Sequence, residues 1–395
     1  MKYIILYFLL PATCFSQWIS LHSPQLSEIA VTGNNIFGTE VDLGIYLSTN
    51  NGVNWSLTSL NTPGFNKISA EGTNIFVGTE QTAGLRGVYR STNSGINWSK
   101  VLSISEIYSV RAITINGNNI YTTTGWKIYR SINNGNNWTE VSNSFFTYSI
   151  AVSPLNPNII FAAAEAGGVY ISTNNGINWA QTSLGNINTL SVKVSGANIF
   201  AGTDAGVYLS TNNGSTWNPT SLDSRRYVSS LTISGANIFA GTDDGVYFSS
   251  NNGAVWFQKN QGLIGNISEG PHLYSTDNFI FASNEGTSSF RRDLSEIINI
   301  NQISTVVPKG ISLSQNYPNP FNPATKINFS LPYKSDVTLK VLDITGKKIA
   351  LLINEKLNSG TYEYFFNAAS FSSGIYFYKL EAENFSETKR MMLVK

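Results

Sequence analysis

The chain has 395 residues, a formal net charge of +1 and only 12% charged residues, which argues against an extended basic surface for nucleic acid. Aromatic residues also make up 12% of the chain, and this balance favours an all-β protein over a helical one. The length allows two or three domains, and we expect two. Cys14 is the single cysteine, so no disulfide can form within the chain.

The first 16 residues predict a secretory signal peptide. Lys2 is followed by an apolar run from Ile4 to Leu10, and then by small or polar residues up to Ser16. The apolar run is much shorter than the roughly 20 residues of a membrane span, and no later run is longer. We therefore expect transit through the periplasm, cleavage after Ser16, and a mature chain without a transmembrane segment.

One signature, first seen as Ser48-x-Asn50-x-Gly52-x-x-Trp55, occurs six times. Its tryptophans are Trp55, Trp98, Trp138, Trp179, Trp217 and Trp256. A self-similar period of about 40 residues is typical of four-stranded units repeated around an axis. Residues 17–293 therefore predict a β-propeller.

The repeat at residues 67–101 predicts four strands, at 68–70, 74–79, 87–91 and 96–101, because runs of β-forming residues alternate with Gly- and Asn-rich turns. In the first strand of five units, a small residue stands between two apolar ones, which suits a crowded axis. The small residues are Ala30, Ser69, Thr114, Ala151 and Thr232, and Lys193 is the exception.

The two ends of the repeat region predict the number of blades. After Trp256 comes a degenerate unit, at residues 279–291, that lacks the tryptophan strand. Residues 17–21, which include Trp18, resemble the missing strand. We therefore expect a seven-bladed ring closed by the amino-terminal segment. An open array of six units with a decayed seventh is the alternative.

The signature resembles the Asp-box, or bacterial neuraminidase repeat, of sialidases, sortilin-type receptors, xyloglucanases and photosystem assembly propellers. Asn50 and its equivalents stand where Asp is usual, and either side chain can accept a backbone N–H in a turn. The glycine supplies a positive φ, and the tryptophan is expected to pack between blades. The resemblance implies that these turns are scaffold, on the face opposite any binding site.

Residues 294–310 break the repeat and predict a linker, and a second domain is expected at residues 311–395. Three prolines, Pro318, Pro320 and Pro323, force an extended opening to this domain. Strands are predicted at 326–331, 337–343, 360–367, 374–381 and 389–394.

This second domain resembles the type A carboxy-terminal sorting domain of proteins exported by the type IX secretion system of Bacteroidetes. The resemblance is carried by Tyr317, Pro318, Asn319, Pro320 and Phe321 at the opening, Gly346, Gly374, and the basic end from Lys389 to Lys395. It implies a seven-stranded immunoglobulin-like sandwich, recognition by the outer-membrane translocon, removal in many members by a sortase-like peptidase, and a secreted or surface location. A generic β-sandwich adhesion domain is the alternative.

We find no pattern of residues that predicts catalysis. His22 and His272 have neither metal-ligand nor triad spacing, and no glycine-rich loop opens a helix. We therefore expect no catalytic residue, no metal site and no cofactor. Three arginines occupy equivalent third-strand positions and are interpreted as blade-edge residues instead of a sialidase triad, namely Arg90, Arg130 and Arg291. Arg111, Arg225 and Arg226 stay open as site residues.

The turn after the second strand carries an acid in six of seven units, namely Glu40, Glu80, Glu165, Asp204, Asp243 and Glu285, whereas the third unit has Gly125-Trp126. The acids are either turn residues or a ring that binds a cation, a basic peptide or sugar hydroxyls. Aromatic side chains in the same set of loops either offer stacking surfaces or pack the rim of the ring, namely Trp126, Tyr108, Phe145, Phe146 and Tyr227.

The function expected from these features is a non-catalytic binding propeller, exported by type IX secretion, that recognises a protein or a glycan through the loop face. A secreted glycosidase that uses two of the six acids is the first alternative. The single ring argues against it, because the related xyloglucanases join two rings around a cleft. A structural or assembly scaffold is the second alternative.

Overall fold

The computed structural model describes residues 17–21, 25–80, 85–105, 108–141, 145–222, 224–264, 269–283, 289–298, 300–368 and 371–395. The predicted signal peptide at 1–16, His22 and Glu285 lie outside these ranges. The chain divides into two compact units, of which one is Trp18–Leu294 and the other contains Ser295–Lys395. Both units consist of antiparallel β-sheets, as the composition predicts.

The described residues of the first unit form seven four-stranded sheets, which we number from the amino-terminal end. The first sheet contains β2 (Glu28–Thr32), β3 (Asn35–Glu40), β4 (Gly44–Ser48) and β5 (Ser56–Leu57). The second contains β6 (Phe65–Glu71), β7 (Asn74–Thr79), β8 (Gly87–Ser91) and β9 (Ser99–Ser103). The third contains β10 (Ala112–Asn116), β11 (Asn119–Thr123), β12 (Ile128–Ser131) and β13 (Thr139–Val141). The fourth and fifth contain β14 (Thr147–Val152), β15 (Ile160–Ala164), β16 (Gly168–Ser172) and β17 (Ala180–Gln181); and β18 (Thr189–Ser195), β19 (Asn198–Thr203), β20 (Gly206–Ser210) and β21 (Asn218–Pro219). The sixth contains β22 (Val228–Ser234), β23 (Asn237–Thr242), β24 (Gly245–Ser249) and β25 (Phe257–Gln258). The seventh contains β26 (His272–Ser275), β27 (Phe279–Ser283), β28 (Ser289–Asp293) and β1 (Ile19–Ser20).

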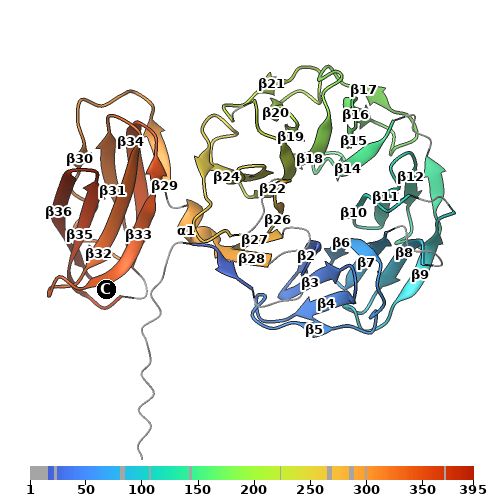
Figure 1. Ribbon diagram of the computed structural model, residues 1–395, viewed down its shortest axis with the longest axis horizontal. Helices are drawn as coiled ribbons and strands as arrows, with labels where there is room; N and C mark the ends of the chain where they lie inside the picture. Colours follow the sequence, from blue (N-terminus) through green and yellow to red (C-terminus); the bar gives the residue numbers. More distant parts are fainter. Residues whose placement is uncertain are drawn as a thin grey trace, which may run out of the picture. The chain divides into compact units, whose positions relative to one another are not determined.

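The seven sheets lie around a common centre (Figure 1). The first strand of each sheet is innermost, and each inner strand neighbours the inner strand of the next sheet. The last inner strand, β26, neighbours the first, β2. β1 pairs with β28 through Ile19 and Ser20, so the amino-terminal segment supplies the outer strand of the seventh sheet, as the position of Trp18 predicts.

The repeated signature forms a turn whose polar side chains cap backbone N–H groups. In the fourth sheet, the N–H of Gly176 donates to Oγ of Ser172 at 2.8 Å, and the N–H of Asn178 donates to Oδ1 of Asn174 at 2.9 Å. The serine-to-glycine bond is present in all six copies. Asn175 has a φ of 61° and Gly176 a φ of 83°, a conformation that favours asparagine and glycine.

These capped turns also correct one strand boundary. The strand predicted at 96–101 begins after the tryptophan instead, as β9 (Ser99–Ser103). The reason is that the N–H of Ile96 donates to the carbonyl of Asn93, and the N–H of Asn97 donates to Oδ1 of Asn93. The groups that a strand would need for its ladder are therefore already bonded inside the turn.

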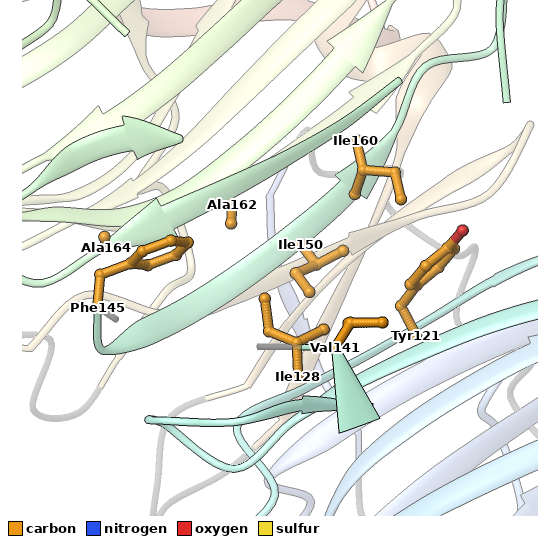
Figure 2. Packing of buried hydrophobic residues seen from close by; sticks show 8 residues of the cluster. All are labelled: Tyr121, Ile128, Val141, Phe145, Ile150, Ile160, Ala162 and Ala164. Atoms are coloured by element: carbon orange, nitrogen blue, oxygen red, sulfur yellow. The ribbon is translucent and has the colours of Figure 1, made fainter. Parts of the chain in front are cut away.

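The core lies between neighbouring sheets. Figure 2 shows one such cluster, in which Tyr121, Ile128 and Val141 of the third sheet meet Phe145 and the inner strands of the fourth. Trp179 packs against the same cluster, as predicted for the signature tryptophans. Burial of each large apolar side chain stabilises the fold by about 1.5–3 kcal/mol, so these interfaces hold the sheets together.

Arginines of the third strands form polar links between neighbouring sheets. Arg90 in the second sheet donates to Oδ1 of Asn136 in the third at 2.9 Å and to the carbonyl of Asn134. Arg291 in the seventh sheet donates to the carbonyl of Asn51 in the first. The structure therefore agrees with the interpretation of Arg90 and Arg291 as blade-edge residues.

The second unit contains two four-stranded sheets. In spatial order, the first of these contains β29 (Ile300–Ser304), β34 (Gly360–Asn367), β31 (Ala324–Leu331) and β30 (Ser312–Leu313). The second contains β33 (Lys348–Leu357), β32 (Ser335–Leu342), β35 (Gly374–Ala382) and β36 (Phe385–Leu393). Buried and exposed residues alternate along β31 and β34, as expected for sheets with one face in a core.

The linker predicted at residues 294–310 was wrong in part. This segment contains the helix α1 (Leu294–Ile298) and the strand β29, which pairs with β34. Ile300 is buried opposite Tyr364, so apolar burial secures the strand. The described residues of this unit form eight strands, one more than the sorting-domain resemblance implies, because β29 is added from the predicted linker.

Candidate functional site

Five predicted site acids fall within the described residues, and all lie at the turn between the second and third strands of their sheets. The third strand then runs to the signature turn, so the acids are at the opposite end of the sheets. In four sheets, the acid's backbone N–H donates to a carbonyl just before the inner strand. The pairs are Glu80 to Gly64, Glu165 to Phe146, Asp204 to Asn188 and Asp243 to Tyr227. These bonds agree with a turn-forming role.

The five acids do not form an even acidic ring. Glu165 and Asp204 are exposed, whereas Glu40 is only 9% exposed. Oε2 of Glu40 and Oδ1 of Asp243 are buried without a hydrogen-bond partner. The side chains with room to meet a ligand in solvent are therefore those of the fourth and fifth sheets.

The third sheet departs from the acidic pattern and builds an aromatic cluster, which we define as Trp126, Phe146 and Tyr148. Trp126 is 49% exposed, and its ring centre lies 5.6 Å from that of Phe146, edge to face. The Phe146 and Tyr148 ring centres are 5.2 Å apart. A Cβ at Gly125 would lie 2.6 Å from the Phe146 ring, so glycine is needed for this approach.

A bulge in β14 explains where Tyr148 points. Thr147 pairs with Ala164 and Ser149 with Ala163, so Tyr148 is the extra residue between two consecutive partners. A bulge of this kind re-aims a side chain. Bulges occur at the same place in β6, β18 and β22, where the extra residues are Asn66, Leu190 and Ser229. Only in the fourth sheet does the bulge present an aromatic side chain.

Charged groups surround the aromatic cluster. Burial raises the pKa of the Tyr148 hydroxyl, and so do the nearby Glu165 and Tyr227, whereas Arg111 lowers it. The Glu165 carboxylate therefore lies near the Tyr148 hydroxyl. The guanidinium of Arg111 lies 5.8 Å from the ring centre of Phe146. A cation and a carboxylate therefore lie beside the aromatic cluster.

The cluster extends toward the sheets across the ring through Tyr227, which precedes β22. Burial raises the pKa of the Tyr227 hydroxyl, and the charges of Glu269 and Asp204 raise it further. The sequence left Arg111 and Arg226 as possible site residues. Arg111 lies at the aromatic cluster, whereas Nη2 of Arg226 forms an ion pair with Oδ2 of Asp244 at 2.9 Å. Residues of the third to seventh sheets thus interact electrostatically in this region.

The sequence predicted some of these residues and missed others. Trp126, Phe146 and Tyr227 are brought to this region, and Tyr108 is 38% exposed. Of the two interpretations of Phe145, the structure supports packing, because the side chain is buried and stacks on Tyr170 with ring centres 3.7 Å apart. Tyr148 was missed because strand alternation alone does not reveal a bulge.

In the second unit, the predicted sorting motif binds the last strand of the chain. The N–H of Phe321 donates to the carbonyl of Met392 at 2.9 Å, and the carbonyl of Phe321 accepts from Val394 at 3.0 Å. Oδ1 of Asn319 accepts the N–H of Met392 at 2.9 Å. Phe321 is 2% exposed, whereas Tyr317 is 80% exposed. The opening motif and the chain end are therefore one structural element.

The other motif residues lie in turns and strand ends. Pro318 uses its carbonyl to accept from Thr325, and Pro320 follows Asn319 directly. Gly346 has a φ of 80° in a turn closed by its own N–H and the carbonyl of Asp343. Gly374 begins β35, Lys389 pairs with Glu387 at 2.9 Å, and the N–H of Lys395 donates to Ser373.

Residues 315–395 match the secretion system C-terminal sorting domain family. The chain is therefore exported by type IX secretion to the cell surface or the extracellular space, and its sorting domain interacts with that machinery. No curated protein is significantly similar to this chain in sequence. Within the described ranges, no helix is long and apolar enough to span a membrane, and no group of three or more His, Cys, Asp or Glu side chains is arranged to hold a metal ion.

Similar solved structures have propeller-like folds. One is YCF48 bound to D1 peptide, at 16% identity and a TM-score of 0.55, over 71% of this chain and 98% of that one. YCF48 from Cyanidioschyzon merolae matches at 15% identity and 0.53, over 70% and 98%. The GH74 enzyme of Niastella koreensis matches at 16% identity and 0.53, over 70% of this chain but 43% of the enzyme. At these identities, the likeness shows the fold alone.

Proposed function

We propose that this protein is a non-catalytic binding propeller of seven Asp-box-like blades, displayed or released outside the cell, that binds a protein or a glycan at the aromatic cluster. The observation that carries the proposal is the exposure of Trp126 beside Phe146 and Tyr148, flanked by Arg111 and Glu165. An exposed indole among aromatic rings stacks well on sugar rings and on apolar peptide side chains.

The charged flanks favour an oriented ligand over a purely apolar one. Arg111 offers donors and Glu165 offers acceptors, so a ligand with both hydroxyl or amide donors and acceptors finds partners on each side. The fold relative YCF48 is described with a bound peptide, which supports a peptide as one of the two ligand classes. The six capped turns lie at the other end of the sheets and fit a scaffold role, in agreement with the Asp-box resemblance.

Delivery is the better supported half of the proposed function. We further propose that residues 1–16 act as a signal peptide, that the second unit is an immunoglobulin-like sorting domain, and that a sortase-like peptidase removes it after export. The junction of the opening motif with the last strand supports a single recognition element at the chain end.

The test is a screen of the purified full chain against a glycan array and a peptide library, with product analysis of every hit. We expect saturable binding without turnover. Trp126→Ala and Glu165→Gln should each weaken binding about ten-fold or more, since each removes a stacking or hydrogen-bonding partner. Glu140→Gln, which changes an exposed glutamate on the outer strand β13, should leave binding unchanged.

Each other outcome selects a different function. Reaction products that disappear in Glu165→Gln would replace the binding role by glycoside hydrolysis, for which the GH74 fold relative is the precedent. Binding that is equal in Trp126→Ala and in the unmodified chain would move the site away from the aromatic cluster. Absence of any saturable ligand would leave the structural or assembly scaffold.

A further inference from the structure

Besides Glu71, which ends β6, four side chains that are charged or carry an imidazole lie on the described inner strands of the first unit. They are Glu28 in β2, Lys67 in β6, Lys193 in β18 and His272 in β26, and we call them the ring-centre cluster. Figure 1 shows that these strands face one another around the middle of the ring. The predicted function uses none of the four, and the sequence indicated only that Lys193 stands where small residues are usual.

Three members of the cluster occupy the same place in their sheets. Glu28 lies opposite Thr39, Lys67 opposite Gly78 and His272 opposite Ser283. β2 neighbours both β6 and β26, so these three side chains belong to consecutive inner strands.

In three other sheets this place is a serine with a clear structural task. The hydroxyls of Ser149, Ser191 and Ser230 accept the N–H of the next inner strand, from Val192, Leu231 and Leu273. Glu28 does the same through Oε2, which accepts the N–H of Ile68 at 2.8 Å. Lys67 is unable to do so, because an ammonium group only donates. The lysine is therefore not a variant of the serine link.

Lys193 comes from across the ring. Its strand β18 is flanked by β14 and β22, whereas β2 is flanked by β6 and β26, yet Lys193 interacts electrostatically with Glu28. The side chain is exposed although its strand is innermost, so solvent reaches it. Surrounding protein nevertheless desolvates the ammonium and lowers its pKa. Both facts are expected of a long side chain that extends into a narrow central space.

The charges of the cluster do not balance. Nζ of Lys67 lies 3.9 Å from Oε1 of Glu28, and the same carboxylate is the charge that attracts Lys193. Within the described part of the chain, the Lys193 ammonium makes no hydrogen bond or ion pair of its own. Burial and the nearby Lys67 lower the pKa of His272 to about 3, so its imidazole is neutral at physiological pH and retains one N–H donor. Two ammonium groups therefore share one carboxylate.

We propose that the ring centre binds a small oxyanion between Lys193, Lys67 and His272. A sulfate, phosphate or carboxylate group would accept hydrogen bonds from both ammonium groups and from the imidazole N–H, and would balance the second positive charge. At the level of Lys193, the side chains of Ala30, Ser69 and Ala151 are small, whereas that of Tyr274 in β26 is large.

The test measures anion binding to the purified full chain at constant ionic strength, with chloride as the reference salt. Sulfate, phosphate and acetate are titrated separately, and binding is followed by thermal unfolding and by the imidazole resonances. We expect a saturable rise in Tm and a saturable shift of the His272 resonance with at least one of the three. The anion that binds most tightly identifies the preferred oxyanion.

Matched lysine variants locate the site. Lys193→Met should raise the Kd about ten-fold or more, and Lys67→Met should also weaken binding, since each removes a charge-assisted donor. Lys100→Met, at an exposed lysine of the outer strand β9, should bind as the unmodified chain does. Absence of saturation with all three anions in the unmodified chain would overturn the proposal. Binding by Lys193→Met that equals that of the unmodified chain would also overturn it. If Lys193→Met does not fold, the same comparison is made with Lys67→Met.

Discussion

Trp18 is expected to hold the ring closed, and its replacement by alanine tests this most directly. Trp18 is 2% exposed, its Nε1 donates to the carbonyl of Lys259, and its backbone N–H donates to Gln261 at 2.8 Å. The next two residues pair with β28. The side chain thus anchors a two-residue strand to segments more than 240 positions later in the chain.

The magnitude follows from the burial of the indole. A buried tryptophan removes about 200 Å² from water, which corresponds to about 5 kcal/mol, and the lost indole hydrogen bond adds about 1 kcal/mol. Because alanine keeps part of the apolar area and the site relaxes in part, we expect Trp18→Ala to cost about 3–5 kcal/mol. For a unit of this size, this lowers Tm by about 6–20 °C.

The assay is thermal unfolding followed by near-ultraviolet circular dichroism on the full chain. Trp126→Ala is the matched control, because the same substitution at a 49% exposed tryptophan should change Tm by less than about 2 °C. A Trp18→Ala protein that melts with the unmodified chain would refute closure by the amino-terminal segment. An equal loss in both variants would show that the effect is not specific to closure.

Three further predictions concern the turns, the chain end and the ring centre. Ser172→Ala should lower the unfolding free energy by about 1–3 kcal/mol, because it removes the acceptor of the Gly176 N–H. Asn174→Asp should change it by less than about 0.5 kcal/mol, because the carboxylate still accepts the N–H of Asn178. Equal effects of the two variants in denaturant titrations would contradict the capping role. Asn319→Ala should reduce delivery of the protein to the cell surface, measured by protease accessibility on intact cells, because it removes the bond to the N–H of Met392. Asn322→Ala, at an exposed residue, should not reduce it. Normal delivery of both variants would show that sorting does not depend on the contact between the opening motif and the last strand. The pKa of His272 is about 3 in the folded chain and near 6.5 in the unfolded chain. Between these two pH values the unfolded chain therefore binds more protons than the folded chain. The unfolding free energy should fall as the pH is lowered from 6.5 to 3, by up to about 1.4 kcal/mol per pH unit. His272→Gln should remove that component from acid unfolding curves, and an unchanged slope would argue against the shift.

The repeat could be predicted from the sequence because its interactions are local. The bonds that define each turn join residues no more than four positions apart, such as Ser172 and Gly176, so the same eight residues create the same turn wherever they occur. The spacing of the turns then determines the length of each repeat, and each repeat forms one four-stranded sheet.

The parts that the sequence did not predict depend on distant partners. β29 was assigned to a linker because residues 294–310 break the repeat and are polar with scattered Ile and Val. The partner of Ile300 is Tyr364 in β34, far along the chain. Tyr148 depends on the register between β14 and β15, in which one extra residue reverses the alternation. Neither pairing leaves a local signal, so both required the structure.

The two candidate sites share a physical origin in broken repetition. A ring of equivalent sheets presents the same side chains on every sheet, and such a surface has no single place that a ligand can recognise in one orientation. Trp126 replaces an acid, and Tyr148 occupies a bulge that elsewhere holds Asn66, Leu190 or Ser229. Lys193 replaces a small residue in the same way at the ring centre. The capped turns and the signature tryptophans maintain six of the seven sheets. The departures from the pattern are therefore free to create one asymmetric surface, and substitution at these positions should change binding without changing the fold.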